Sequence, residues 1–215
     1  MADAEPLSHR ERRLVTIAAL AAAAPEGLDA ALHDALASGD LTLDELLEVV
    51  LHFAVYAGWP KASHLEMVLA TQWATVHEAR GETPPLWPTV APDPGHTGVD
   101  RRAAGNLKFE EVNLFPAPPV DSPYRGAVVE WVFGDLWYRP GISRRDRRLV
   151  SITCAALSGA PFALGIHVST ARQSGDVSPA AMDDLVRQVR GAVGTDRARP
   201  LADAVEQARA APPTP

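Results

Sequence analysis

The sequence has a single cysteine, Cys154, among its 215 residues. One thiol cannot form an intramolecular disulfide, and its isolation excludes any CxxC pair for redox or zinc chemistry. No apolar run reaches about 18 residues without a charge, so we expect no transmembrane span. The first nine residues lack the basic and apolar regions of a secretory signal. We therefore expect a soluble, cytoplasmic protein with no membrane partner.

Positive charge is also scarce. The formal net charge is −7 and the isoelectric point is about 5.5, whereas a nucleic-acid-binding protein normally presents a basic face. Two groups of arginines each open a predicted helix beside acidic residues: Arg10, Arg12 and Arg13, and then Arg144, Arg145, Arg147 and Arg148. We interpret both groups as solvated helix faces and expect no nucleic-acid partner.

Strand-like alternation is missing from the sequence, and helical periodicity takes its place. The sequence therefore predicts an all-α fold. Ser8 with Glu11, and Thr42 with Glu45, form capping boxes that start two of the helices. The predicted helices cover about residues 8–24, 28–37, 42–57, 61–80, 99–112, 124–138 and 143–157, then a helix through His167 to 173 and one that starts at Pro179. We expect the Ala-, Arg- and Pro-rich tail to fray.

Proline divides the chain. Residues 83–98 and 116–123 are rich in proline and glycine, a composition typical of semi-rigid linkers. We therefore predict a first helical unit at residues 1–82, a proline-rich linker with a short helix at 83–123, and a second helical unit at 124–215.

The two helical units repeat one another. Residues 7–17 match residues 142–152 at an offset of 135, and residues 38–42 match residues 174–178 at an offset of 136. Two matches at nearly the same offset, with helices in the same order, indicate a tandem duplication.

The helix that starts at Thr42 carries candidate functional groups. It and the corner after Gly58 present polar or aromatic side chains at helical spacing: Glu48, His52, Tyr56, Trp59 and His64. These side chains could form a small polar site. Alternatively, the helix is buried and His52 simply hydrogen-bonds Glu48. There is no HExxH motif and no second carboxylate at a reliable spacing, so we expect no metal site.

Three stretches resemble the carboxymuconolactone decarboxylase family, within the alkylhydroperoxidase D-like superfamily. They are residues 133–150, the spacing of His167 and Gly175, and residues 48–60 together with His64. The resemblance implies an all-helical unit that forms trimers or hexamers, with sites between helices and often between subunits. A fused tandem copy then implies a homo-oligomer, a trimer that resembles a hexamer.

The redox branch of this superfamily uses a CxxC motif followed four residues later by a histidine. His167 occupies that histidine position, but Ala160 and Ala163 occupy the two cysteine positions. Thiol peroxidase chemistry requires a reactive thiolate and a resolving partner. We interpret Cys154, on an apolar helix, as a buried inert thiol.

The decarboxylase branch lacks CxxC and fits better. The resemblance implies removal of CO₂ from a lactone acid without a cofactor. Such a reaction requires a donor or cation that stabilises the developing oxyanion, and a setting that favours neutral CO₂ over the carboxylate. It also requires a general acid that reprotonates carbon, for which histidine is suited.

We distribute these roles over both copies. The candidate catalytic residues are His167, His52, His64 and Glu48, and the candidate substrate-binding residues are Tyr56, Trp59 and Arg139. Glu48 would orient His52 and fix its tautomer. For each histidine the alternative is a structural imidazole, and for Arg139 it is a structural ion pair.

Neither copy contains the complete set. Copy one has Ala31 where a histidine would match His167, and copy two lacks the aromatic corner. Either a composite site forms between the copies or between protomers, or the site has decayed. We predict a cofactor-independent decarboxylase or lyase that acts on a small anionic lactone or keto acid, with histidine as general acid and base. The alternative is a non-catalytic oligomeric protein of the same fold that binds a ligand or supports assembly.

Overall fold

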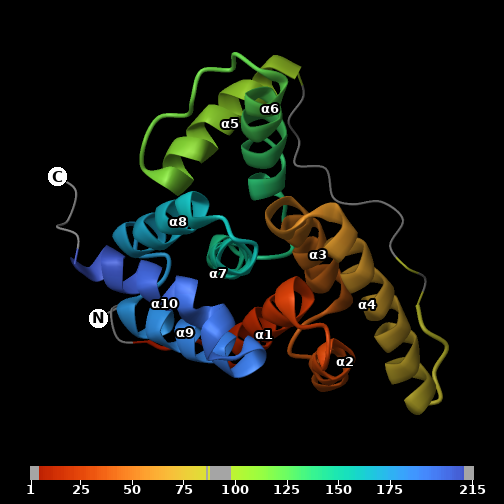
Figure 1. Ribbon diagram of the computed structural model, residues 1–215. Coiled ribbons are helices and arrows are strands. Elements are labelled where there is room, and N and C mark those ends of the chain that lie inside the picture. Colours follow the sequence, from red (N-terminus) through yellow and green to blue (C-terminus); the bar gives the residue numbers. More distant parts are fainter. Residues whose placement is uncertain (1–4, 86, 88–97, 211–215) are drawn as a thin grey trace.

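The computed structural model describes residues 5–85, 87 and 98–210, and its regular elements within these ranges are all helices (Figure 1). The first four are α1 (His9–Ala23), α2 (Leu28–Ser38), α3 (Leu43–Ala57) and α4 (Trp59–Ala79). The last four are α7 (Arg144–Leu157), α8 (Pro161–Gln173), α9 (Pro179–Val193) and α10 (Thr195–Ala210). Between the two sets lie α5 (Gly98–Asn113), α6 (Pro123–Gly126), a π-helix (Ala127–Phe133) and a 3-10 turn (Leu136–Tyr138). The predicted all-α fold is confirmed.

Capping boxes start three of these helices. At α3, the Thr42 side chain accepts from the backbone N–H of Glu45, and the Glu45 carboxylate accepts from the backbone N–H of Thr42. The same reciprocal pair occurs at α1 and at α7, where Ser143 is the N-cap residue. Each box satisfies backbone donors that the first turn of a helix leaves without partners.

Our prediction that the C-terminal tail frays is wrong. The segment forms α10, whose Ala198, Leu201 and Val205 are buried at spacings of three and four residues. These side chains pack against the second helical set, in a core shared with α8 and α9. These three apolar residues form a stripe that is hard to recognise among the surrounding Arg and Pro residues, yet its burial is sufficient to stabilise the helix.

The first helix of each helical set packs against both sets. α1 packs against α7 and α9, and α7 packs against α1 and α3. The core around α3 and α4 accordingly includes Val150 and Cys154 of α7, and the core around α8 to α10 includes Val15 and Ala19 of α1. The first helix of each copy thus packs against the third helix of the other, so that polar side chains of both copies meet between them.

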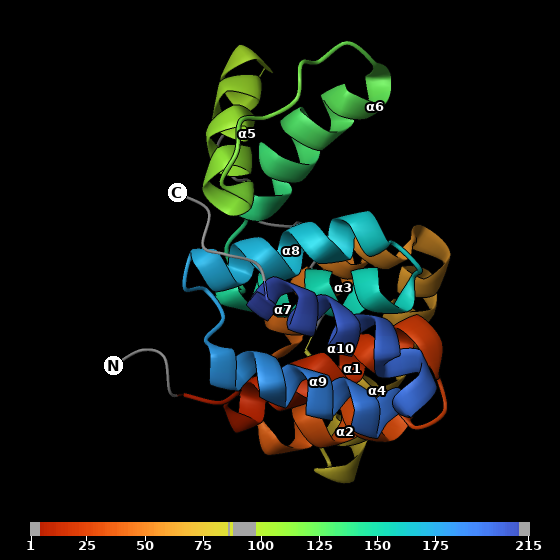
Figure 2. The same ribbon diagram turned by 60° about the vertical axis from the view of Figure 1, so that its left-hand side comes forward.

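A cap layer, formed by α5, α6 and the π-helix, covers one side of the two helical sets (Figures 1 and 2). α5 and the π-helix approach closely at two glycines. A Cβ on Gly105 would lie 1.9 Å from the carbonyl oxygen of Val129, and one on Gly134 would lie 2.6 Å from the carbonyl oxygen of Arg101. Only glycine permits this approach of one backbone to another.

The cap layer has its own small core, which also contacts α3. Its buried members include Phe109, Val112, Phe133 and Trp137, and Tyr56 of α3 packs against them. The short helix that we predicted within the linker is α5, and it makes tertiary contacts. The division at residues 82 and 123 stays a prediction. No helix in the described part of the chain is long and apolar enough to cross a membrane.

Candidate active site

Glu48 of α3 lies at the centre of a buried charged cluster. Its side chain is 8% exposed, and it pairs with Arg139, in the segment before α7, and with Arg147 of α7. The Arg147 guanidinium is 1% exposed and also donates to the backbone carbonyl of Arg139, at 2.8 Å. Two guanidinium groups around one carboxylate give these three side chains one net positive charge, which favours an anion nearby.

His52 lies one turn along α3 and is fully buried. Its Nδ1 is 3.3 Å from a guanidinium nitrogen of Arg147, and its Nε2 is 2.9 Å from the Ser151 hydroxyl. Guanidinium only donates hydrogen bonds, so Nδ1 is the acceptor and Nε2 carries the proton toward Ser151. The hydrogen bond from His52 to Glu48 that we considered is replaced by this contact, with Arg147 between the two residues.

Tyr56 continues the row along α3. Its hydroxyl accepts from the indole N–H of Trp137 at 3.1 Å. Burial raises the pKa of this phenol, so it keeps its proton at neutral pH. Tyr56 also contacts both histidines: its ring centroid is 5.0 Å from that of His52 and 5.3 Å from that of His167.

His167, on α8, is 5% exposed. Its Nδ1 is buried and has no hydrogen-bond partner among the described residues. Burial, followed by the nearby positive charge of Arg148, lowers the pKa of His167 to about 3. Burial also lowers the pKa of His52 well below its usual range, with Arg147 and His167 as further causes. Both imidazoles are therefore neutral near pH 7.

A pocket of about 630 Å³ opens beside this cluster, between the cap layer and the helices α3 and α8. Tyr56 and His167 belong to its lining, whereas His52 lies behind them. Ala160 and Ala163 also line the pocket, so methyl groups occupy the two positions where the redox branch carries cysteines. Cys154 is fully buried, and burial raises the pKa of its thiol.

The structure brings most of the predicted site residues together within one chain. Glu48, His52 and Tyr56 of copy one meet His167 of copy two, and Arg139 joins them as an ion-pair partner of Glu48. This geometry matches the composite arrangement between the copies. Which of these residues act in chemistry stays a prediction.

Two predicted residues lie elsewhere. His64 is on the exposed side of α4, and no contact links it to the buried cluster in the described part of the chain. Trp59 is 58% exposed and stacks on Trp131 of the π-helix, with ring centroids 6.3 Å apart. The corner after α3 therefore contributes an aromatic contact to the cap layer, and the buried polar groups come from α3 itself.

Sequence reasoning missed three partners: Arg147, Ser151 and Trp137. Our interpretation of the arginines at the start of α7 as a solvated face is wrong for Arg147 and Arg148, whose side chains are 1% and 0% exposed. The spacing of Arg147 and Ser151, four residues apart on a helix that carries the repeat motif, was a usable signal. Among the described residues, no group of three or more His, Cys, Asp or Glu side chains is placed to hold a metal ion.

The repeat also produces a second polar array, between α1 and α9. Asp184, Gln188 and Ala192 occupy the positions on α9 that are equivalent to the Glu–His–Tyr series of α3. Asp184 pairs with Arg12 at 2.8 Å, and Gln188 donates to the Thr16 hydroxyl at 2.7 Å. Arg12 and Thr16 are the α1 counterparts of the arginine and serine on α7. The second array therefore keeps the ion pair and the hydrogen bond but has neither imidazole nor phenol.

Comparison with known proteins places this geometry in context. The model of the carboxymuconolactone decarboxylase family matches residues 1–71 and 124–207, so that both copies are covered. The nitrosuccinic acid decarboxylase npaB of Metarhizium robertsii is 31% identical over 68 residues, 32% of this chain and 48% of that protein. The match thus spans about half the length of this relative.

Proposed function

The chain belongs to the carboxymuconolactone decarboxylase family, and on this premise we propose that it removes CO₂ from a small carboxylic acid without a cofactor. The departing carboxylate would lie beside a lactone, keto or similar group that accepts the electron pair. The observation that carries the proposal is the meeting of Tyr56 and His167 on the lining of an apolar pocket, next to buried positive charge.

Hydrogen bonds lead from the charged cluster toward the pocket. Arg147 donates to His52 and His52 donates to the Ser151 hydroxyl, while the Tyr56 hydroxyl accepts from the indole N–H of Trp137. Because the Trp137 N–H binds the phenol oxygen, the Tyr56 O–H can donate to a ligand in the pocket. When CO₂ leaves and its bonding electrons move onto the carbonyl oxygen, this phenol stabilises the oxyanion. The Arg147 cation polarises the hydrogen bond from His52 to Ser151.

His167 supplies the proton in this proposal. The imidazole is neutral in the free protein, with a pKa of about 3. A bound carboxylate places a negative charge beside the ring, which raises the pKa of His167 and increases the protonated fraction of the imidazole as the substrate binds. After CO₂ departs, the imidazolium gives this proton to the carbanionic carbon and returns to the neutral form. The apolar walls disfavour the charged carboxylate relative to neutral CO₂.

The name of the fungal relative is consistent with this chemistry. Nitrosuccinic acid carries a nitro group, which accepts electrons as a lactone or keto carbonyl does. Either kind of acceptor would require an oxyanion donor and a group that protonates carbon. For the present chain we propose the reaction type and leave the identity of the acceptor group to a substrate panel.

The test is CO₂ release by the purified protein from a panel of β-keto acids, lactone acids and nitro acids, in buffer with EDTA and no thiol. We expect His167→Gln to lower the rate by about 10²- to 10⁴-fold and Tyr56→Phe to lower it by about 10²- to 10³-fold. His33→Gln, on α2 outside the pocket lining, is the matched control and should leave the rate unchanged. Undiminished activity of His167→Gln would reassign the acid.

A non-catalytic ligand-binding role is the second candidate, favoured by the second array, which has lost its imidazole and phenol while the fold is kept. Its signature is binding of unreactive carboxylates in the pocket without CO₂ release from any member of the panel. In either case we propose a homotrimer as the assembly. Size-exclusion chromatography with light scattering tests this, and a mass near that of the 23.0 kDa monomer would refute it.

A further inference from the structure

We infer that the ligand of this pocket is a carboxylic acid with an apolar body of about the size of an aromatic ring, and that compact dicarboxylic acids are poor ligands. The inference rests on the proposed function only for which end of the ligand faces His167. The rest follows from the size of the pocket, the apolar character of its walls and the ion pair between Arg125 and Asp121.

The pocket is large for a compact acid. Its volume of about 630 Å³ falls within the range of about 300–1,000 Å³ that is typical of sites for drug-sized ligands. Aromatic and aliphatic side chains form most of the lining, including Phe109, Val132, Phe133 and Phe162. A small polar acid would leave these walls in contact with water, whereas a ring would remove apolar surface from water on both partners.

The polar groups of the pocket lie on two sides with different roles. His167 and Tyr56 come from the buried cluster, and in this proposal the carboxylate faces these two lining residues. Arg125, on the cap layer, is the cationic side chain among the described lining residues, and its guanidinium already donates to Asp121 at 2.8 Å. A second carboxylate on the ligand would share this arginine with Asp121, so it would meet a cation whose charge is already compensated.

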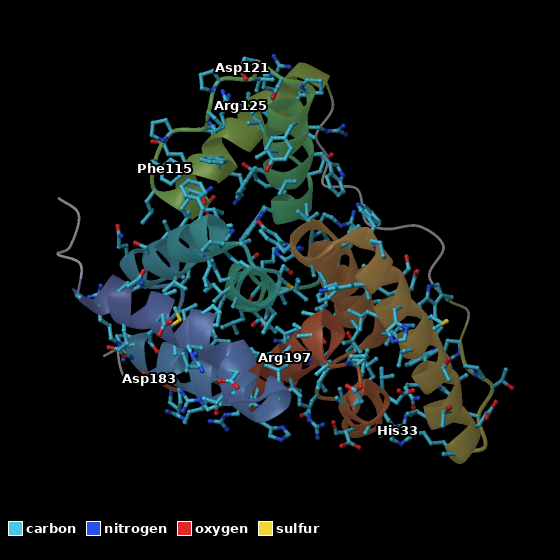
Figure 3. All side chains as sticks on the ribbon, in the orientation of Figure 1. His33, Phe115, Asp121, Arg125, Asp183 and Arg197 are labelled. Atoms are coloured by element: carbon cyan, nitrogen blue, oxygen red, sulfur yellow. The ribbon has the colours of Figure 1, made fainter. Side chains whose placement is uncertain are left out.

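The cap layer supplies much of the apolar wall. Phe109 comes from α5, Val132 and Phe133 come from the π-helix, and Figure 3 shows Phe115 and Arg125 on the same layer, above α8 in that view. The glycine contacts described above hold α5 and the π-helix tightly together. Phe162 is 83% exposed, so the pocket is open to solvent beside it and a ligand can extend outward. The preference of the pocket for an apolar ligand body therefore comes mainly from the cap layer, which lies in sequence between the two copies.

Binding of unreactive acids to the wild-type protein tests the inference without turnover. Isothermal titration with acetate, succinate and phenylacetate is sufficient, with 2-naphthylacetate as a larger probe. We expect phenylacetate to bind at least about tenfold more tightly than acetate or succinate, because a buried ring is worth that much in apolar transfer alone. Succinate binding as tightly as phenylacetate would overturn the inference.

Two leucine variants on α8 locate the effect. Ala163→Leu narrows the pocket and should remove the preference for phenylacetate while the affinity for acetate changes less than about threefold. Gly165→Leu is the matched control, because it lies at an exposed position of the same helix with nothing within 4 Å of an added Cβ. An equal loss in both variants, or none in Ala163→Leu, would place the ring elsewhere and contradict the inference.

The two proposals fail separately. Tight binding of phenylacetate with no CO₂ release from any acid refutes decarboxylation and leaves the apolar ligand class intact. CO₂ release from compact acids, with no gain in affinity or rate for aryl-substituted ones, refutes the ligand class and leaves decarboxylation intact.

Discussion

Replacing Glu48 by glutamine should destabilise the protein more than any comparable change on its surface. The carboxylate serves two guanidinium groups whose side chains are 10% and 1% exposed. Removing one partner of a buried ion pair leaves the other charge buried and uncompensated, which typically costs about 3–5 kcal/mol. Glutamine keeps the shape and one acceptor oxygen, so the loss reports on the charge and not on a cavity.

The internal repeat provides a matched control. Asp184→Asn removes the equivalent carboxylate, which is 8% exposed like that of Glu48, but its partners Arg12 and Arg187 have side chains 39% and 62% exposed. Because water solvates the guanidinium groups that are left behind, we expect a loss of about 1 kcal/mol or less. Urea denaturation followed by far-ultraviolet circular dichroism gives both free energies of unfolding. The two free energies can be compared if wild type and both variants show a single transition with the same m-value.

The expected difference is large enough to be seen by heating as well. For a chain of this length each kcal/mol lowers the melting temperature by about 2–4 °C, so Glu48→Gln should melt at least about 6 °C below wild type. Equal losses for the two variants would falsify the view that burial, and not the ion pair itself, decides the cost. A more stable Glu48→Gln would show that Arg139 and Arg147 are not held by this carboxylate.

Three further predictions follow from burial and close packing. Burial holds the pKa of His52 and His167 below the usual value near 6.5, so the unfolded chain binds more protons than the folded chain below that pH. The free energy of unfolding should therefore be flat above pH 7 and fall by about 1.4 kcal/mol per histidine for each pH unit below 6.5. His167→Gln should halve the slope that urea denaturation measures between pH 6 and 5. Gly105→Ala should disrupt the cap layer and abolish ligand binding in titrations, whereas Gly165→Ala, with open space around its Cβ, should melt at or slightly above the wild-type temperature. Cys154, fully buried with a raised pKa, should react with iodoacetamide only after unfolding, and rapid labelling of the native protein, followed by mass spectrometry, would contradict its placement.

Local signals in the sequence predicted the helices well. The capping boxes at Ser8 and Thr42 placed two helix starts correctly, because a reciprocal side-chain pair depends only on residues three apart. The tail was misjudged because Ala198, Leu201 and Val205 gain their stability from a distant helical set. The segment after Ser122 was predicted as one helix and forms an α-turn, a π-helix and a 3-10 turn in succession. Its wide central turns pack against α5, a contact that helical periodicity does not encode.

The candidate site was predictable only in part. The series from Glu48 to Tyr56 was visible as helical spacing, and the duplication showed that His167 belonged to the other copy. The packing of the first helix of each copy against the other copy was not visible, and it is this packing that places Arg147 and Ser151 beside His52. Burial of an arginine is a property of what packs over it. Sequence composition therefore favoured a solvated face at a position where the structure has a charged core.

The two unequal arrays have a consequence for how a fused chain can change. In a symmetric pair of identical subunits every substitution appears twice, so an imidazole lost from one array is lost from both. Here positions 52 and 188 are encoded independently, and one carries histidine while the other carries glutamine. The chain can thus vary its second array without touching the first. We expect a stoichiometry of one ligand per chain, half of what two symmetric arrays would hold.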